Sequence, residues 1–160
     1  MEIERKFLVK RGFDYRSRAR VSYKIRQGYI PAKTVSVRIR QRDDEAFLTI
    51  KSRITHGFSR YEFEKQIEPS EAAELMKLCE GAFIEKTRYL IDVGKHTFEV
   101  DEFSGNNEGL VIAEVELGSE DEIFEKPDFI GREVTGDKRY YNSSLVAFPY
   151  CLWRQTEREE

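Results

Sequence analysis

The chain has 160 residues, of which 36% are charged and 39% hydrophobic, and 27 basic residues nearly balance 30 acidic ones. Proteins that bind nucleic acid typically have a surplus of basic residues, which this chain lacks, so we do not expect a nucleic-acid partner. The chain has 8 tyrosines and 11 phenylalanines, which is too many for a disordered protein. Its length fits a single domain with a sizeable core.

The two cysteines, Cys79 and Cys151, have no CxxC motif or Cys/His cluster beside them. This argues against a disulfide scaffold or a structural zinc site. The N-terminus is charged and lacks the apolar run of a signal peptide. No stretch approaches the roughly 18 apolar residues that a membrane span requires. We therefore expect a cytoplasmic protein that has no membrane partner.

Alternation of apolar and polar residues with period two is the dominant pattern, and it predicts β-strands. The segments that show it are residues 2–9, 22–30, 35–42, 46–52, 59–68, 83–92, 96–102 and 110–117. Short turn sequences separate several of them, namely Asp43-Asp44, Thr55-His56-Gly57 and Val93-Gly94-Lys95. Such short links predict antiparallel hairpins.

Helices are predicted in three places. Residues 70–79 begin with a serine that can cap a helix and continue with good helix formers. A short helix is expected from Ser119, because acidic residues fill its first turn, and a third over residues 137–147. The segment 11–21 is predicted to be a loop or a short helix. We expect one domain over residues 1–150, followed by a C-terminal tail over 151–160.

Most predicted strands carry two charges of the same sign on one face, because residues i and i+2 of a strand share a face about 6.5–7 Å apart. The acidic pairs are Glu2 and Glu4, Glu62 and Glu64, Glu99 and Asp101, and Glu114 and Glu116; the basic pairs are Arg38 and Arg40, and Lys86 and Arg88. Charges of one sign repel unless cations bridge the carboxylates and an oligoanion bridges the bases. For any single strand, an ordinary solvated face is the simpler interpretation.

Closing about eight such strands into a barrel removes the sheet edges and leaves room for one small ligand. If the charged faces point inward, the outward apolar faces need cover from the helices at 70–79 and 137–147. Mg²⁺ and Mn²⁺ prefer carboxylate oxygens, and Arg and Lys suit phosphate oxygens. A triphosphate is the ligand that needs several of both at once.

The segment Glu2-Ile3-Glu4-Arg5-Lys6 resembles the ExExK signature of the CYTH domain, the triphosphate tunnel metalloenzyme family. The resemblance continues in the family's order through Arg26-Gln27-Gly28-Tyr29, Arg38-Ile39-Arg40, Lys51, Glu62-Phe63-Glu64, Glu85 to Tyr89, Asp101, Glu114-Val115-Glu116 and Glu133 to Tyr140. It implies a mainly β (α+β) fold, an eight-stranded antiparallel β-barrel tunnel with a few flanking helices. The short single-domain form is most similar to the family's bacterial inorganic triphosphatases.

The same resemblance implies roles for individual residues. Metal ligands would be Glu2, Glu4, Glu114 and Glu116, with Glu62, Glu64 and Asp101 as helpers or ligands of a second Mg²⁺ or Mn²⁺ ion. Phosphate would be held by Arg38, Arg40, Lys51, Lys86, Arg88, Lys138 and Arg139. The catalytic residues would be Lys6, Tyr29 and Lys86. Acidic neighbours stabilise a charged ammonium, which favours positioning of the attacking water by Lys6 over proton abstraction.

The implied reaction is metal-dependent hydrolysis of tripolyphosphate to pyrophosphate and phosphate. Class IV-type adenylate cyclase activity and hydrolysis of thiamine or nucleoside triphosphate are alternatives within the family. Outside the enzymes, the chain could act as a polyphosphate or nucleotide sensor. The absence of a clear purine or thiazolium pocket favours the inorganic substrate, and the many carboxylates favour an enzyme over an anion binder. A homodimer is left open, and Trp153 in the tail is expected to pack either back on the barrel or against a second subunit.

Overall fold

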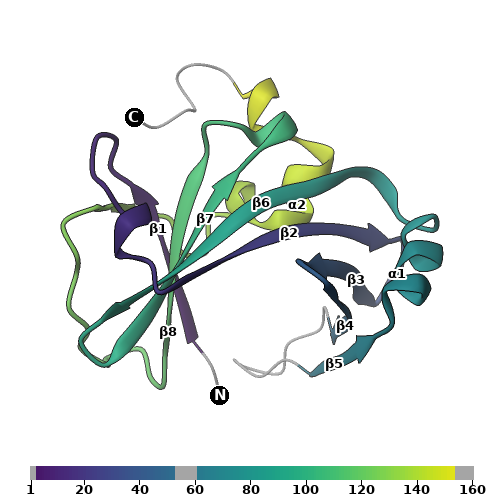
Figure 1. Ribbon diagram of the computed structural model, residues 1–160, viewed down its shortest axis with the longest axis horizontal. Coiled ribbons are helices and arrows are strands. Elements are labelled where there is room, and N and C mark those ends of the chain that lie inside the picture. Colours follow the sequence, from purple (N-terminus) through teal and green to yellow (C-terminus); the bar gives the residue numbers. More distant parts are fainter. Residues whose placement is uncertain (1–2, 53–60, 154–160) are drawn as a thin grey trace. The chain divides into compact units, whose positions relative to one another are not determined.

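The computed structural model describes residues 3–52 and 61–153, and within these ranges the chain is mainly β (Figure 1). The strands are β1 (Ile3–Val9), β2 (Val21–Ile30), β3 (Val35–Arg42), β4 (Glu45–Ser52), β5 (Glu62–Ile67), β6 (Glu80–Val93), β7 (His96–Phe103), β8 (Val111–Leu117) and β9 (Ile130–Glu133). The helices are α1 (Pro69–Met76) and α2 (Asn142–Ala147), and the 3₁₀ turns are η1 (Arg16–Arg18), η2 (Gly105–Asn107), η3 (Lys138–Tyr140) and η4 (Tyr150–Leu152). The strands described here form one antiparallel sheet in the order β5-β4-β3-β2-β6-β7-β8-β1-β9.

The chain divides into two compact units. Unit 1 comprises residues Met1–Tyr23 and Lys86–Glu160, and unit 2 comprises Lys24–Glu85. Strands β2 and β6 each run from one unit into the other, so each unit holds one part of both strands. Charged candidate residues occur in both units.

The predicted strands are confirmed where the structure describes them, and so are two of the predicted turns. Arg42 pairs with Glu45 across the Asp43-Asp44 turn, and Val93 pairs with His96 across Gly94-Lys95. Both turns contain a residue with positive φ, 52° at Asp43 and 61° at Gly94, as tight two-residue hairpins require. The predicted turn Thr55-His56-Gly57 lies outside the described residues.

Three expectations about the C-terminal half need correction. Strand β9 was not predicted, because its four residues are too few to show alternation; it pairs with β1. The helix expected from Ser119 is wrong: the segment is a turn, in which Glu122 accepts a hydrogen bond from the Gly118 amide at 3.0 Å. The helix expected over 137–147 is interrupted at Tyr141, whose ψ of 137° is extended, so only η3 and α2 form.

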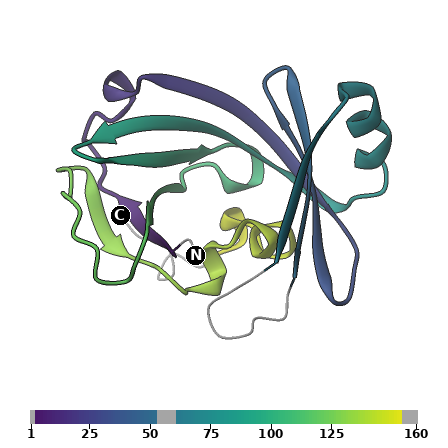
Figure 2. The same ribbon diagram turned by 90° about the horizontal axis from the view of Figure 1, so that it is seen from below.

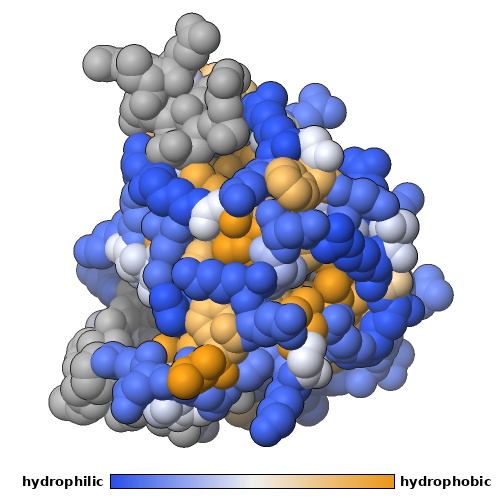
Figure 3. Space-filling view, turned by 90° about the vertical axis from the view of Figure 1, so that its left-hand side faces the viewer, coloured by the Kyte–Doolittle hydropathy of each residue, from blue (hydrophilic) through white to orange (hydrophobic). Residues whose placement is uncertain are grey.

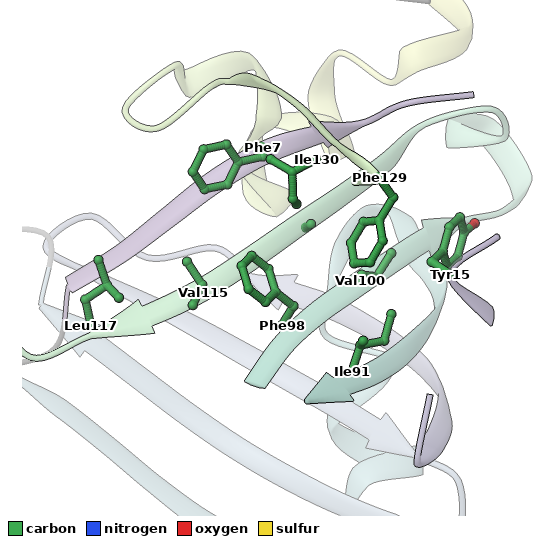
Figure 4. Close-up of a cluster of buried hydrophobic side chains, with 10 residues drawn as sticks. Phe7, Tyr15, Ile91, Phe98, Val100, Val115, Leu117, Phe129 and Ile130 are labelled. Carbon is green, nitrogen blue, oxygen red and sulfur yellow. The ribbon is translucent and has the colours of Figure 1, made fainter. Parts of the chain in front are cut away.

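The core of unit 1 lies on the apolar face of its strands (Figure 4). Its buried members are Phe7, Tyr15, Ile91, Phe98, Val100, Ala113, Val115, Leu117, Phe129 and Ile130. The cover over these strands comes from Tyr15, Phe124, Phe129 and Ile130, which belong to connecting segments and β9. The expectation that a helix over 137–147 covers an apolar face is therefore wrong, since α2 contacts the charged face of the same strands. Each fully buried aromatic or aliphatic side chain contributes about 1.5–3 kcal/mol.

The core of unit 2 lies between α1 and strands β3 and β4. Ala72 and Met76 of the helix pack against Ile39 and Ala46 of the strands. Figure 1 shows α1 beside these strands. The helix confirms the prediction for residues 70–79, although it begins at Pro69 and ends at Met76. Glu68 and Glu71 form a capping box that satisfies its first amides.

On the face drawn in Figure 3, hydrophilic side chains predominate and apolar ones lie between them. The most exposed large apolar side chain in the described ranges is Ile123, at 90%. Cys79 and Cys151 are free thiols. In the part of the chain that the structure describes, no helix is both long enough and apolar enough to cross a membrane.

Candidate functional site

Unit 1 carries a charged face on the side of its sheet opposite the core. We call it the unit 1 face; its charged residues are Glu4, Lys6, Lys86, Arg88, Glu99, Asp101, Glu114 and Glu116. Strand register sets their neighbours: Glu4 lies opposite Glu116, Glu114 lies opposite both Lys6 and Glu99, and Arg88 lies opposite Asp101. Alternation along β1, β6, β7 and β8 therefore places these side chains together, as the sequence predicts.

Asp101 on β7 is the centre of the unit 1 face. Its side chain is only 3% exposed, and its oxygens accept hydrogen bonds from the Lys86 ammonium at 2.8 Å and from the Arg88 guanidinium at 2.8 and 2.9 Å. Burial alone would raise the pKa of Asp101, but the adjacent charges of Lys86 and Arg88 outweigh burial and lower the pKa. The carboxylate therefore stays ionised and fixes the positions of both bases.

Arg88 extends this network along β7. Its second terminal nitrogen lies 2.5 Å from a Glu99 oxygen. Burial would lower the pKa of Arg88, yet the surrounding carboxylates, Asp101 above all, raise it. The bases of β6 thus neutralise the carboxylates of β7, which corrects the expectation that only a metal ion relieves the repulsion between them.

Lys6 on β1 occupies the other margin of the unit 1 face. Its ammonium lies 3.5 Å from Glu114 Oε1, and both side chains are about one-seventh exposed, at 15% and 14%. The same ammonium lies 4.9 Å from the centre of the Tyr141 ring, a cation–π contact. Lys6 is therefore held between a carboxylate and an aromatic ring at the edge of the acidic residues.

The start of α2 lies on the unit 1 face, a placement that the sequence pattern does not predict. Asn142 Oδ1 accepts a hydrogen bond from Lys86 Nζ at 2.9 Å, and the preceding residue, Tyr141, contacts Lys6. Figure 2 shows this C-terminal segment, in yellow, beside the strands. An asparagine at the start of a helix is usually read as a cap, so its sequence position alone does not indicate a contact with Lys86.

Unit 2 carries the second charged face, made up of Gln27, Tyr29, Arg38, Arg40, Thr49, Lys51, Glu62 and Glu64, which we call the unit 2 face. Here, two buried neutral side chains contact the arginines. Gln27 is 0% exposed; its Oε1 accepts from Arg40 Nε at 2.8 Å and its Nε2 donates to the Tyr29 hydroxyl at 3.0 Å. Thr49, 1% exposed, accepts from Arg38 NH2 at 3.2 Å.

The carboxylates of the unit 2 face lie on β5 and are about half exposed. Glu64 Oε1 lies 3.6 Å from the Arg38 guanidinium and accepts from the Thr49 hydroxyl at 3.0 Å, and Glu62 Oε1 lies 3.9 Å from Lys51 Nζ. Arg38 Nε is buried and has no hydrogen-bond partner among the described residues. A buried guanidinium N–H without an acceptor is a donor suited to an anionic ligand.

Whether a divalent cation fits can be judged from the acidic residues of the unit 1 face. Glu4 and Glu116 lie directly opposite each other on β1 and β8, and so do Glu99 and Glu114 on β7 and β8. Facing carboxylates repel and supply the hard oxygen donors that Mg²⁺ and Mn²⁺ prefer, so the donor set fits such an ion. Among the described residues, no three carboxylate, cysteine or histidine side chains converge on one point, and Glu2 lies outside those residues.

The remaining two predicted phosphate ligands, Lys138 and Arg139, lie on η3 in unit 1. The Arg139 guanidinium forms an ion pair with Asp137 at 2.8 Å and lies over the rings of Tyr140 and Trp153. Lys138 is exposed and lines a pocket of about 230 Å³ with Arg139, Ser144 and Phe148. Arg139 thus contributes to the packing of the C-terminal segment, in which Trp153 is buried.

Several residues with direct contacts to the candidate set were missed as site residues, among them Gln27, Thr49, Glu99 and Asn142. For the first three a signal existed, since alternation places Gln27 on the face of Tyr29, Thr49 on the face of Lys51 and Glu99 on the face of Asp101. Gln27 and Thr49 carry no charge and so fall outside the charge pattern, whereas Glu99 belongs to that pattern as the partner of Asp101 on the same strand face. Asn142 had no comparable signal.

The comparisons with known proteins agree on one family. The CYTH domain model matches residues 1–145. The inorganic triphosphatase of Acetivibrio thermocellus is 54% identical over 157 residues, which cover 96% of this chain and 98% of that protein. The inorganic triphosphatase of Nitrosomonas europaea is 42% identical over 153 residues, covering 91% and 96%.

A solved structure described as an inorganic triphosphatase has a similar fold. It superposes with a TM-score of 0.67 at 38% sequence identity, and the match covers 90% of this chain and 96% of that one. Both the sequence and the fold thus support the resemblance first seen in the ExExK segment. The chain belongs to the CYTH domain family.

Proposed function

We propose that this protein hydrolyses inorganic triphosphate to pyrophosphate and phosphate in a reaction that depends on a divalent cation. The observation that carries the proposal is the 54% identity, over 96% of the chain, to a protein named inorganic triphosphatase. The two charged faces supply the chemistry this reaction needs. Phosphoryl transfer requires mainly positioning of the substrate and neutralisation of its charge, not covalent catalysis.

The basic residues are proposed to hold the substrate. Arg38, Arg40 and Lys51 of the unit 2 face and Arg88 of the unit 1 face would donate to the phosphate oxygens. Planar guanidinium groups suit this task because they donate two parallel hydrogen bonds. Lys86 is 1% exposed and bonded to Asp101. We therefore propose that Lys86 lies behind the residues that contact the substrate and supports Arg88. Lys138 is a candidate for the outer phosphate.

Lys6 is proposed to orient the attacking water, with its ammonium held beside Glu114 at 3.5 Å. The water oxygen forms a bond to a terminal phosphorus, the bond from that phosphorus to the bridging oxygen breaks, and pyrophosphate leaves. The arginines neutralise the charge that develops on the leaving oxygen. Tyr29, bonded to Gln27 at 3.0 Å, is placed to contact the substrate beside Arg38, its register partner on β3.

Glu4, Glu114 and Glu116, together with Glu2, would hold one Mg²⁺ or Mn²⁺ ion, and Glu62 and Glu64 are candidates for a second. A bound divalent cation neutralises phosphate charge and makes a coordinated water more acidic. Asp101 was expected among the metal ligands. Because its oxygens already accept from Lys86 and Arg88, we assign it to positioning those bases.

We further propose that residues 1–150 form a single CYTH-type domain whose strands close into a tunnel lined by charged residues, and that 151–160 form a tail. Support comes from the alternation that gathers the charges on one face of each unit and from the match of the CYTH model to residues 1–145.

The test is hydrolysis of tripolyphosphate by the purified protein with Mg²⁺ or Mn²⁺, scoring phosphate and pyrophosphate. We expect Glu4→Gln and Arg40→Ala each to lower kcat/KM by about 100-fold or more, in line with the loss of one charged contact in an enclosed site. Lys77→Ala is the matched control, because this lysine is 71% exposed and pairs only with its helix neighbour Glu74 in the described structure. Wild-type rates in both site variants would refute the assignment.

The same assay with other substrates separates the family alternatives. ATP should yield neither cyclic AMP nor phosphate at rates close to those with tripolyphosphate, and thiamine triphosphate should be a poorer substrate. Efficient cyclic AMP formation would instead indicate a cyclase. Tight binding of tripolyphosphate without turnover at any metal concentration would indicate a sensor.

A further inference from the structure

We infer that Asn142, the first residue of α2, is a positioning residue: it holds Lys86 and, through Lys86 and Asp101, fixes the guanidinium of Arg88 for substrate binding. The inference is based on a series of side-chain contacts that runs from α2 to β6 and β7. The inference rests on the triphosphatase function proposed above, which it deepens by adding a residue outside the charged motifs.

The first contact is the hydrogen bond from Lys86 Nζ to Asn142 Oδ1, at 2.9 Å. The Lys86 side chain is 1% exposed, and its ammonium also lies 2.8 Å from Asp101 and 5.4 Å from the centre of the Phe103 ring. A buried ammonium has three N–H donors and has lost the water molecules that accepted from them. The protein must therefore supply acceptors in their place. Asn142 supplies one such acceptor from a segment 56 residues away in sequence.

The second contact, through Asp101, couples the position of Lys86 to that of Arg88. The Asp101 carboxylate lies 2.8 Å from the Lys86 ammonium. It also accepts two hydrogen bonds from the guanidinium of Arg88, at 2.8 and 2.9 Å. A guanidinium held by two parallel hydrogen bonds keeps one orientation. Of these three side chains Arg88 is the most exposed, at 14% against 3% and 1%. It is therefore the one that can reach a ligand, and the other two fix its direction.

The start of α2 also spans the unit 1 face. Tyr141 contacts the Lys6 ammonium on β1, while Asn142 contacts Lys86 on β6, and β7 and β8 lie between these two strands. Strands three apart in a flat sheet would be about 14 Å from each other. Tyr141, which precedes α2, and Asn142, its first residue, thus contact strands at opposite margins of the unit 1 face. A change at Asn142 is expected to reach Arg88 through Lys86 and Asp101.

The residue type matters at this position. The neutral amide oxygen of asparagine accepts from Lys86 without competing with Asp101 for its charge. An apolar residue of similar size would leave a buried ammonium short of one acceptor, and the Lys86–Asp101–Arg88 network would relax to recover it. An aspartate at the same place would keep an acceptor.

The experiment compares Asn142→Leu, which removes the acceptor, with Asn142→Asp, which keeps one, and with Ser143→Ala on the exposed side of the same helix as the control. Steady-state hydrolysis of tripolyphosphate and thermal unfolding are measured for each. We expect Asn142→Leu to raise KM about tenfold, Asn142→Asp to stay within about threefold of wild type, and Ser143→Ala to be unchanged. A smaller folded fraction would lower kcat and leave KM unchanged, so the KM shift identifies positioning.

A double-mutant cycle with Arg88→Lys tests the route of the effect. Lysine keeps the charge but not the two parallel hydrogen bonds, so in that background Asn142→Leu should change KM less than twofold. A wild-type KM in Asn142→Leu, or its full effect in the Arg88→Lys background, would overturn the inference. If leucine is not tolerated, Asn142→Ala carries the same expectation; failure of both to fold would assign Asn142 a structural role and also overturn it.

Failure of the inference can be told from failure of the proposed function. If wild type and Ser143→Ala hydrolyse tripolyphosphate and Asn142→Leu matches them in KM, only the role of Asn142 is wrong. If wild type hydrolyses no triphosphate with any divalent cation, the proposed function is wrong and the inference falls with it.

Discussion

The two charged faces hold their bases in different ways. On the unit 1 face, Lys86 and Arg88 bind a buried carboxylate, Asp101, at 2.8 Å. On the unit 2 face, Arg40 and Arg38 donate to two buried neutral side chains, Gln27 and Thr49. The carboxylates of unit 2 lie farther from their partners, at 3.6 and 3.9 Å, and are about half exposed.

This difference has a physical consequence. A buried ion pair fixes geometry at a large desolvation cost and makes each partner depend on the other. A neutral acceptor orients an arginine while leaving its positive charge available to an anionic ligand. We therefore expect unit 1 variants to lose stability as well as activity, and unit 2 variants to lose mainly substrate affinity.

The largest expected effect is that of Asp101→Asn. Removing the carboxylate leaves Lys86 and Arg88 buried without their counter-charge, which costs about 3–5 kcal/mol of unfolding free energy when one partner of a buried pair is lost. Urea denaturation measures it. The matched unit 2 variant is Glu64→Gln, which breaks a longer pair whose carboxylate is 48% exposed and should cost less than about 1 kcal/mol. Equal losses in the two variants would remove the distinction between the faces.

A smaller effect is expected for Gln27→Leu on the unit 2 face. Arg40 Nε loses the acceptor that now lies at 2.8 Å, and a hydrogen bond to a charged group is worth about 1.5–3 kcal/mol. We expect this to appear as a rise of about tenfold or more in KM for tripolyphosphate, with kcat changed less. Gln27→Glu keeps the acceptor and should recover most of the affinity. A Gln27→Leu enzyme that loses stability but keeps its KM would show that Gln27 only fills space.

The smallest effect concerns acid stability and a partly exposed pair in unit 1. The Arg5 guanidinium donates to Glu133 at 2.7 and 2.9 Å, and these hydrogen bonds lower the pKa of Glu133 to about 2 from an ordinary 4.5. Its contribution is therefore complete above pH 4.5 and is lost as the pH falls toward 2. Because Glu133 is 36% exposed, solvent screening limits the contribution to about 1 kcal/mol or less.

Denaturation of wild type and Glu133→Gln at several pH values tests this contribution. At pH 6 the variant should be less stable, and the two curves should converge as the pH approaches 2. A difference that stays constant over this range would mean that packing of the side chain, not its charge, sets the effect.

The parts of the fold that could be predicted from the sequence are those set by residues close together in the chain. The parts set by contacts between distant segments could not be predicted. Alternation in segments such as 35–42 and 46–52 is a local signal, and it gave both the strands and the side each residue faces. The four residues of β9 carry no such signal, since their place is set by pairing with β1. The helix expected from Ser119 failed because Glu122 bonds the Gly118 amide and His96 instead of supporting a helical turn.

The candidate site shows the same limit. Alternation placed Arg88 and Asp101 on their faces from sequence spacing alone, but the pairing between them depends on strand register across β6 and β7. From the sequence, Asp101 was expected to bind a metal ion and Arg88 to bind phosphate. For Asp101 this expectation left out the ion pair that the two side chains form with each other. The contact of Asn142 with Lys86 is beyond sequence reasoning, because it joins two segments whose spacing follows no period.

The most direct test of the account is a crystal structure of the protein with tripolyphosphate and Mn²⁺, whose anomalous scattering locates the metal. We predict that tripolyphosphate contacts the guanidinium groups of Arg38, Arg40 and Arg88, and that Mn²⁺ binds Glu4, Glu114 and Glu116. Tripolyphosphate bound away from these arginines, or metal bound away from these carboxylates, would contradict the proposed assignment.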